Sequence, residues 1–165
     1  MILPVVAYGH PVLKHVAEDI EPDYPNLQQL IADMFETMYH SEGVGLAAPQ
    51  INKSIRLFVI DADPFHETYP EAKGFKKVFI NPEIIEVSEE TWSFNEGCLS
   101  LPDMHEDVVR PSKITINYLD ENFVEDEEEF DGIKARVIQH EYGHLEGKVY
   151  VDRVAPMRKM MLKNK

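Results

Sequence analysis

The sequence has 165 residues, which suits one domain that buries about two-thirds of the surface its unfolded chain would expose. With 30 acidic and 16 basic residues, it carries a formal net charge of −14. A surface this acidic repels phosphate backbones and anionic lipids, so binding to DNA or to membranes is not expected. The single cysteine excludes an internal disulfide, and neither a signal peptide nor an apolar run of about 20 residues is found. These features predict a cytoplasmic protein.

Apolar residues recur at spacings of three and four over residues 25–40, which predicts an amphipathic helix that begins at Pro25 and ends before Gly43. Apolar or alternating runs then predict four strands, at residues 55–60, 77–80, 83–87 and 113–119. Asn81 and Pro82 are expected to separate the second of these strands from the third. The acidic run at residues 125–131 is interpreted as a solvated sheet edge or loop.

A second helix is predicted to begin after Asp131, a suitable N-cap, because a helical period of apolar residues and histidines follows it to Leu145. Several strands with two helices, without regular alternation of strand and helix, predict an α+β fold. No internal repeat and no linker-like segment interrupts residues 1–165, so we expect a single domain.

The second helix carries the sequence His140-Glu141-Tyr142-Gly143-His144. Histidines four residues apart on a helix lie about 40° apart around its axis and about 6 Å along it, so both rings can reach one ion. The adjacent Glu141 can accept a proton from water at that ion. The alternative is a pair of surface histidines, but Ile138 and Leu145 predict that this part of the helix packs inward.

Cys98, within residues 96–100 (EGCLS), is the candidate third ligand. A thiolate binds zinc or ferrous iron strongly, and two imidazoles with one thiolate leave a fourth position for water. A lone cysteine is more often a small buried hydrophobe, and only the histidine pair favours the metal interpretation here.

Residues 43–50 (GVGLAAPQ) form a glycine-rich segment with the spacing of a dinucleotide-binding loop. We reject that interpretation because a predicted helix precedes the segment and Pro49 lies within it, whereas the nucleotide loop follows a strand and opens a helix. Glycines can bring backbone amides close to a substrate, and the Gln50 side chain is suited to donate to an oxyanion. An ordinary tight turn is the alternative.

Together these segments resemble the three signatures of the peptide deformylases, G-x-G-L-A-A-P-Q, E-G-C-L-S and Q-H-E-x-D-H-L-x-G. Every defined position of residues 43–50, 96–100 and 139–147 matches except Gly143, where the family pattern has aspartate. An aspartate there would lie beside the ligand face of the helix, where it could orient a ligand or pair with Arg110.

The resemblance covers essentially the whole chain, and it implies the family's fold and activity. The fold would consist of small antiparallel sheets around the HExxH helix. The activity would be metal-dependent hydrolysis of the formyl group from the N-terminal formyl-methionine of nascent polypeptides, releasing formate.

The resemblance also implies a role for each matching residue. The metal ligands would be Cys98, His140 and His144, and the ion would be Fe(II), with zinc, nickel or cobalt as substitutes. Glu141 would act as general base and then as general acid. The oxyanion donors would be the Gln50 amide and the backbone N–H of Leu99.

For the substrate, the resemblance implies that the backbone at Val44 and Gly45 pairs with the main chain of the peptide. The methionine side chain would enter an apolar pocket. Its walls would be Val44, Phe94, Ile133, Val137 and one face of His140. Ile133 and Val137 lie one helical turn apart and lead up to His140, which is compatible with this pocket.

Two other functions fit part of the pattern. A zinc endopeptidase also carries HExxH but usually takes its third ligand downstream, and the 21 residues after His144 contain no histidine. A metal-binding protein of this fold without activity is the second alternative.

Residues 153–165 contain five basic residues and no acidic one, which predicts contact with ribosomal RNA near the exit of the nascent chain. An ordinary solvated terminus is the alternative for this segment.

Overall fold

The structure is a computed structural model that describes residues 1–98 and 101–148, with only the backbone described for Cys98 and residues 101–105. The two helices are α1 (Leu27–His40) and α2 (Gly132–Leu145). The strands are β1 (Gly45–Ala47), β2 (Leu57–Asp61), β3 (Lys76–Val87), β4 (Thr91–Cys98), β5 (Leu101–Pro111), β6 (Lys113–Leu119) and β7 (Glu125–Asp131). Four short 3-10 helices complete the described elements, η1 (Pro11–Lys14), η2 (Ala48–Ile51), η3 (Asp63–Phe65) and η4 (Pro70–Ala72). Among the described residues, no helix is long and apolar enough to span a membrane.

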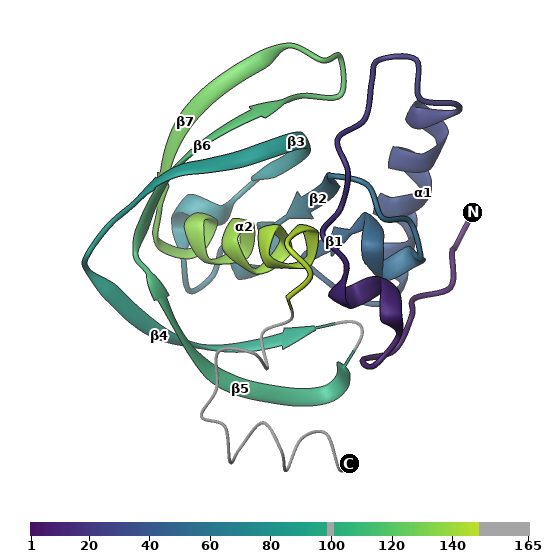
Figure 1. The fold of residues 1–165 in the computed structure, drawn as a ribbon. Helices are drawn as coiled ribbons and strands as arrows, with labels where there is room; N and C mark the ends of the chain where they lie inside the picture. Colours follow the sequence, from purple (N-terminus) through teal and green to yellow (C-terminus); the bar gives the residue numbers. More distant parts are fainter. Residues whose placement is uncertain (99–100, 149–165) are drawn as a thin grey trace.

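Helix α2 lies in the middle of the fold, between a five-stranded sheet and a two-stranded sheet (Figure 1). The larger sheet has the order β1-β2-β3-β6-β7, and the smaller one pairs β4 with β5. Every pair of neighbouring strands in both sheets is antiparallel. The α+β prediction, with small antiparallel sheets around the HExxH helix, is therefore confirmed.

Strand β2 is buried on both faces, which explains its continuous apolar sequence. Leu57 and Val59 belong to an apolar cluster shared with α1, whereas Phe58 and Ile60 belong to a second cluster that includes α2 residues such as Ile138. The two helices therefore cover opposite faces of the larger sheet. The α2 members of the second cluster extend from Ile133 to Leu145.

Strand β3 corrects the prediction of two separate strands at residues 77–80 and 83–87. The chain continues as one strand through Asn81, whose φ of +48° accompanies a register shift between Ile80 and Glu83 in the pairing with β6. The Asn81 side chain accepts a hydrogen bond from the Ile20 N–H at 2.9 Å and donates one to the Ile20 carbonyl at 2.8 Å. A distant segment therefore stabilises a bulge where the sequence indicates a break.

Other boundaries also differ from the predictions. Helix α1 begins at Leu27, two residues after the predicted Pro25, because Asn26 has a left-handed φ of +56°. The glycine-rich segment is not only a loop, since it contains strand β1 followed by η2. Strands β4 and β5 were not predicted. The acidic run forms β7 at the edge of the larger sheet, as the sequence analysis allowed, and its charges discourage further strand pairing.

The end of α2 packs against the N-terminal part of the chain. The Ala17 N–H donates to the Leu145 carbonyl at 2.8 Å. Gly147 has a φ of +77°, and a Cβ at this position would lie 2.6 Å from the Lys14 carbonyl oxygen. Only glycine fits this turn without displacing η1, which accounts for the last defined position of the third motif.

Candidate active site

Helix α2 brings together His140, Glu141 and His144, as the sequence predicts. One ligand atom from each side chain lies within 4.8 Å of those of the other two, and all three residues are buried. The two imidazole rings are separated by 5.4 Å between centroids. Burial lowers the pKa of His144 well below its ordinary value, with the charges of His140 and Arg110 acting in the same direction, so its ring is neutral and able to bind a metal ion.

The Glu141 carboxylate has the environment of a proton acceptor. Burial raises its pKa to about 7, and the charge of Glu96 adds to this effect while the charges of His140 and Arg110 oppose it. Its Oε1 atom is buried and has no hydrogen-bond partner among the described residues. Two imidazoles beside a buried carboxylate oxygen without a partner fit a metal ion together with a water molecule.

Gly45 of β1 lies directly against Glu141. A Cβ at position 45 would be 2.6 Å from Oε2 of Glu141 and 2.8 Å from its Cδ. Any other residue would force the carboxylate to move. The second glycine of the first motif is therefore explained by the space that the Glu141 side chain occupies.

Gln50 lies in η2 and is only 1% exposed. Its Oε1 accepts a hydrogen bond from the Ala47 N–H at 3.0 Å. In the same segment the Val44 carbonyl accepts a hydrogen bond from the Asp61 N–H at 2.9 Å, so this carbonyl is directed toward β2. Successive residues of a strand direct their backbone N–H and C=O groups to opposite edges. Gly45 therefore directs these groups to the edge of β1 that faces away from β2.

Glu96, for which the sequence predicted no role, is buried in β4 and accepts four hydrogen bonds. Oε1 accepts from His140 Nδ1 at 2.8 Å and from Arg110 Nη2 at 2.9 Å. Oε2 accepts from Arg110 Nε at 2.7 Å and from Arg136 Nη1 at 2.6 Å. Burial raises the pKa of Glu96, but the hydrogen bonds from His140 and Arg110 outweigh it and hold the carboxyl well below its usual range.

The bond to Glu96 also fixes the His140 ring. A carboxylate can only accept, so the proton is assigned to Nδ1 and the Nε2 atom is left to bind a metal ion. Only one signal in the sequence could have revealed this arrangement. Arg136 occupies a core-facing helical position one turn before His140, where a buried cation needs an anionic partner.

The remaining predicted residues differ in how far the structure describes them. Strand β4 ends at Cys98, and its backbone is paired there with Leu101. The Cys98 side chain and all of Leu99 lie outside the described residues, so their roles stay predictions. The four apolar residues predicted as pocket walls belong to one region, since Ile133 and Val137 are buried members of an apolar cluster against which Val44 and Phe94 pack.

The surroundings of Gly143 give little support to the role suggested for an aspartate at this position. Apart from its chain neighbours and the backbone of its own helix, the only described atom within 4 Å of a Cβ there would be the Lys148 carbonyl oxygen, at 3.8 Å. The two tasks suggested for an aspartate, orienting a histidine and pairing with Arg110, are both performed by Glu96. His140 and Arg110 therefore already have a carboxylate partner without one at position 143.

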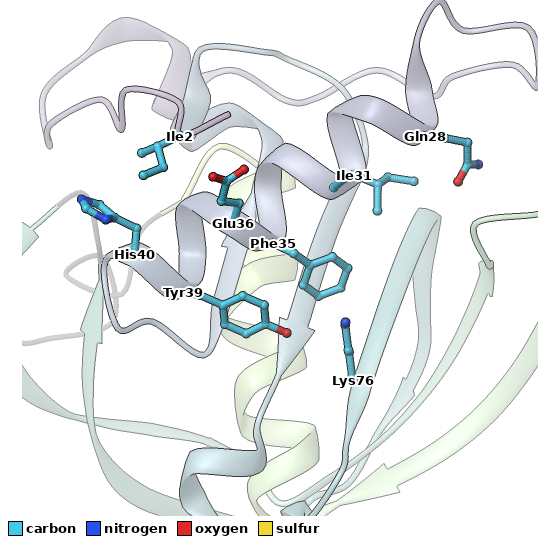
Figure 2. A pocket seen from close by; sticks show the side chains of 9 residues that line it. Ile2, Gln28, Ile31, Phe35, Glu36, Tyr39, His40 and Lys76 are labelled. Atoms are coloured by element: carbon cyan, nitrogen blue, oxygen red, sulfur yellow. The ribbon is translucent and has the colours of Figure 1, made fainter.

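A surface pocket of about 790 Å³ lies elsewhere, on the outer face of α1 (Figure 2). Phe35 and Tyr39 stack there, and Lys76 Nζ lies 4.7 Å from the centroid of the Phe35 ring. None of the predicted site residues lines this pocket. The chemistry is concentrated around α2 instead.

The family model for polypeptide deformylase matches residues 2–160. The chain is 53% identical to the peptide deformylase of Flavobacterium johnsoniae over 172 aligned residues, covering 100% of this chain and 88% of the relative. It is 43% identical to the peptide deformylase of Salinibacter ruber, covering 99% of this chain and 86% of the relative.

Solved structures give the same result. The fold matches the crystal structure of a peptide deformylase from Legionella pneumophila with a TM-score of 0.87 and 39% identity, covering 100% of this chain and 93% of that one. It also matches the enzyme from Ehrlichia chaffeensis in complex with actinonin, with a TM-score of 0.90 and 34% identity, covering 99% of this chain and 94% of that one. The chain therefore belongs to the polypeptide deformylase family, the metallohydrolases that remove the formyl group from formyl-methionyl nascent polypeptides.

Proposed function

We propose that this chain is a catalytically active deformylase whose metal ion is held by Cys98, His140 and His144 and whose proton carrier is Glu141. The observation that carries the proposal is the Glu141 carboxylate, which is buried beside both histidines and has an oxygen with no hydrogen-bond partner among the described residues. Such a carboxylate suits a water molecule at the same place. An inactive metal-binding protein has no need to keep this arrangement.

Deformylases depend on a metal ion, and we propose Fe(II) as the ion in this chain, with zinc, nickel or cobalt as substitutes. Two imidazoles and a thiolate form a donor set that suits these ions. A bound divalent ion would supply Lewis acidity, which lowers the pKa of a water molecule and polarises the formyl carbonyl. His140 is prepared for this role because Glu96 holds its Nδ1–H at 2.8 Å.

In the proposed reaction Glu141 accepts a proton as water attacks the formyl carbon. It then donates this proton to the departing nitrogen as the C–N bond breaks, so the products are formate and a peptide with an amino terminus. A carboxyl group with a pKa of about 7, raised by burial, is suited to both steps near neutral pH.

The negative charge that develops on the formyl oxygen would be stabilised by the Gln50 amide and the Leu99 N–H. The orientation of Gln50 supports its part. Because its Oε1 accepts from the Ala47 N–H, the Nε2 group is on the opposite side of the amide and can act as a donor. Leu99 directly follows the end of β4, beside the proposed ligand Cys98.

The peptide substrate would extend the larger sheet at β1. This strand comes first in the sheet order, so no described strand pairs with its other side. Since the Val44 carbonyl is directed toward β2, we propose that Gly45 makes the main-chain contacts on that open side. The methionine side chain would then enter the pocket formed by Val44, Phe94, Ile133, Val137 and His140.

An anaerobic assay with formyl-Met-Ala-Ser, together with metal quantification on the same sample, tests the proposal. We expect formate release and about one ion per chain. One bound ion without turnover would identify a metal-binding protein that has lost its activity. Cleavage of internal peptide bonds in an unformylated peptide would instead favour the endopeptidase alternative.

We further propose that the protein acts in the cytoplasm, and that residues 153–165 bind ribosomal RNA near the nascent chain. This basic segment lies outside the described residues, and the proposal depends on its five positive charges in a chain of net charge −14. Deletion of residues 158–165 should weaken salt-sensitive co-sedimentation with ribosomes and leave turnover of short peptides intact. Unchanged co-sedimentation would exclude this contact.

A further inference from the structure

Arg136 is among the largest fully buried side chains of the described residues, and only 1% of its surface is exposed. A buried guanidinium is costly unless its charge is paired and its donors are satisfied. An apolar residue would suit this core-facing position of α2 better if packing were the only requirement. The arginine therefore calls for an explanation.

The guanidinium of Arg136 connects α2 to both strands of the smaller sheet. Nη1 donates to Glu96 Oε2 at 2.6 Å and to the Val108 carbonyl at 2.9 Å, and Nη2 donates to the Trp92 carbonyl at 2.6 Å. Its Cζ also lies 4.9 Å from the centroid of the Trp92 ring. Contacts to a carboxylate, to two strand carbonyls and to an aromatic face restrict the guanidinium to one position.

The other arginine at Glu96 cannot make this connection. Arg110 belongs to β5 and Glu96 to β4, so their bidentate ion pair lies within the small sheet and moves with it. From α2, two side chains reach the carboxylate, with His140 on Oε1 and Arg136 on Oε2. Gln139 also links α2 to β5, but at Pro111, which pairs with Thr91 at the end of the sheet opposite Cys98.

We infer that Arg136 is a positioning residue that fixes the strand bearing Cys98 against the helix bearing His140 and His144. The inference rests on the proposed ligand set. Glu96 lies two residues before Cys98 on β4, and Arg136 lies one helical turn before His140 on α2. By holding Glu96 from α2, Arg136 sets the distance between the two elements that supply the metal ligands, and it keeps Glu96 in place to orient the His140 ring.

The first part of the test compares three purified full-length variants with the wild type. Arg136→Met keeps the apolar length of the side chain and removes its donors, whereas Arg136→Lys keeps one donor group and the charge. Arg56→Met is the matched control. Arg56 also links α2 to a strand, through the Leu145 and Pro82 carbonyls, and lies 5.5 Å from the centroid of the Tyr142 ring, but it does not contact Glu96.

The affinity for Co(II) is measured by chelator competition, and the thiolate-to-cobalt absorption band is recorded for each variant. The melting temperature of the metal-free protein is measured as well. We expect Arg136→Met to weaken Co(II) binding by about 10-fold or more and to shift the band. Arg136→Lys should weaken binding less, because one ammonium cannot reach Glu96 and both carbonyls together. Arg56→Met should lower the melting temperature and leave affinity and band unchanged.

A double variant separates action through Glu96 from a general loss of stability. In the Glu96→Gln background, Arg136→Met should weaken Co(II) binding further by much less than it does in the wild type. Equal Co(II) affinities for Arg136→Met and Arg56→Met would overturn the inference. If Arg136→Met does not fold, an unchanged affinity in folded Arg136→Lys would overturn it equally. Failure of the wild type to bind Co(II) would instead contradict the proposed ligand set.

Discussion

The backbone of Gly45 and the carboxylate of Glu141 occupy adjoining space, with no room for a methyl group between them. A Cβ on residue 45 would lie 2.6 Å from Glu141 Oε2. The first and third motifs are therefore in direct contact, although they are far apart in the sequence. The contact fixes the proposed proton carrier beside the strand that we expect to bind the substrate.

Replacement of Gly45 by alanine should displace the Glu141 carboxylate and reduce kcat by about 10²-fold, a loss typical of a misplaced general base. Bound metal should be retained, because neither histidine is disturbed. Steady-state kinetics and metal quantification check this. Gly143→Ala is the control, since its Cβ would meet its nearest described neighbour at an ordinary 3.8 Å. Normal kcat in the Gly45 variant would show that the carboxylate can move without consequence.

Glu141→Gln should preserve the shape of the site while removing the proton acceptor. We expect kcat to fall by at least about 10²-fold while the metal content stays near one ion per chain. Turnover and metal content should be measured on the same preparation. Retention of near-normal turnover would assign the proton transfer to another group.

Cys98→Ser tests the ligand whose side chain lies outside the described residues. Serine is a poorer ligand for these ions, so metal affinity and activity should fall together. Chelator competition measures the first quantity and formate release the second. A serine variant that keeps both would mean that Cys98 is a packed hydrophobe and that the third ligand is another residue.

Gly143→Ala should raise the free energy of unfolding by about 1 kcal/mol, the difference in helix propensity, without changing metal content. Gly143→Asp should stabilise less, because a negative charge in the last turn of α2 opposes the helix dipole. It should also leave Co(II) affinity unchanged, since Glu96 already orients His140. Chemical denaturation and chelator competition are the measurements. Tighter Co(II) binding in the aspartate variant would restore a role for the carboxylate of the family pattern.

Glu128 on β7 should make part of the stability dependent on pH. Burial raises its pKa, but the hydrogen bond from Tyr118 at 2.5 Å and the charge of Lys77 at 3.4 Å outweigh burial, so the pKa is lowered from 4.5. A carboxylate with a lower pKa in the folded state stabilises the protein above its unfolded pKa, and this contribution is lost as the pH falls through the folded pKa.

Glu128→Gln should therefore lower the free energy of unfolding at pH 7 and reduce the further loss of stability below about pH 4.5 relative to the wild type. Urea denaturation at several pH values measures both effects. Glu127→Gln removes the same charge from an exposed neighbour that does not contact Tyr118, and it is the matched control. Identical pH profiles for the two variants would contradict the assignment.

The sequence predicts best those features that depend on local periodicity. The positions of His140, Glu141 and His144 follow from the helical repeat of α2, and the structure places their ligand atoms together as expected. The continuity of β3 could not be predicted, because the left-handed conformation of Asn81 is stabilised by hydrogen bonds to Ile20, a residue 61 positions away.

The Glu96 network was missed for the same reason. Its partners Arg110, Arg136 and His140 lie 14, 40 and 44 positions away, and no local pattern relates them. The β4–β5 pairing that brings Arg110 to Glu96 was itself not predicted, because the alternation in β4 is confined to residues 91–95 and β5 shows no clear alternation of apolar and polar residues. Such contacts depend on pairing between residues that are far apart in the sequence, and no short segment indicates this pairing.

The contact between the start of the described chain and the end of α2 has a consequence for the order of folding during synthesis. Ala17 donates to Leu145, and Gly147 fits against Lys14, so these contacts form only after α2 has been synthesised, whereas Leu3 and Val6 find partners in α1 and η2. Helix α2 also supplies apolar residues to one of the two core clusters and carries both histidines. The histidine pair of a newly synthesised molecule therefore cannot form until α2 has been made, although the cluster between α1 and the larger sheet contains no α2 residue and does not depend on it.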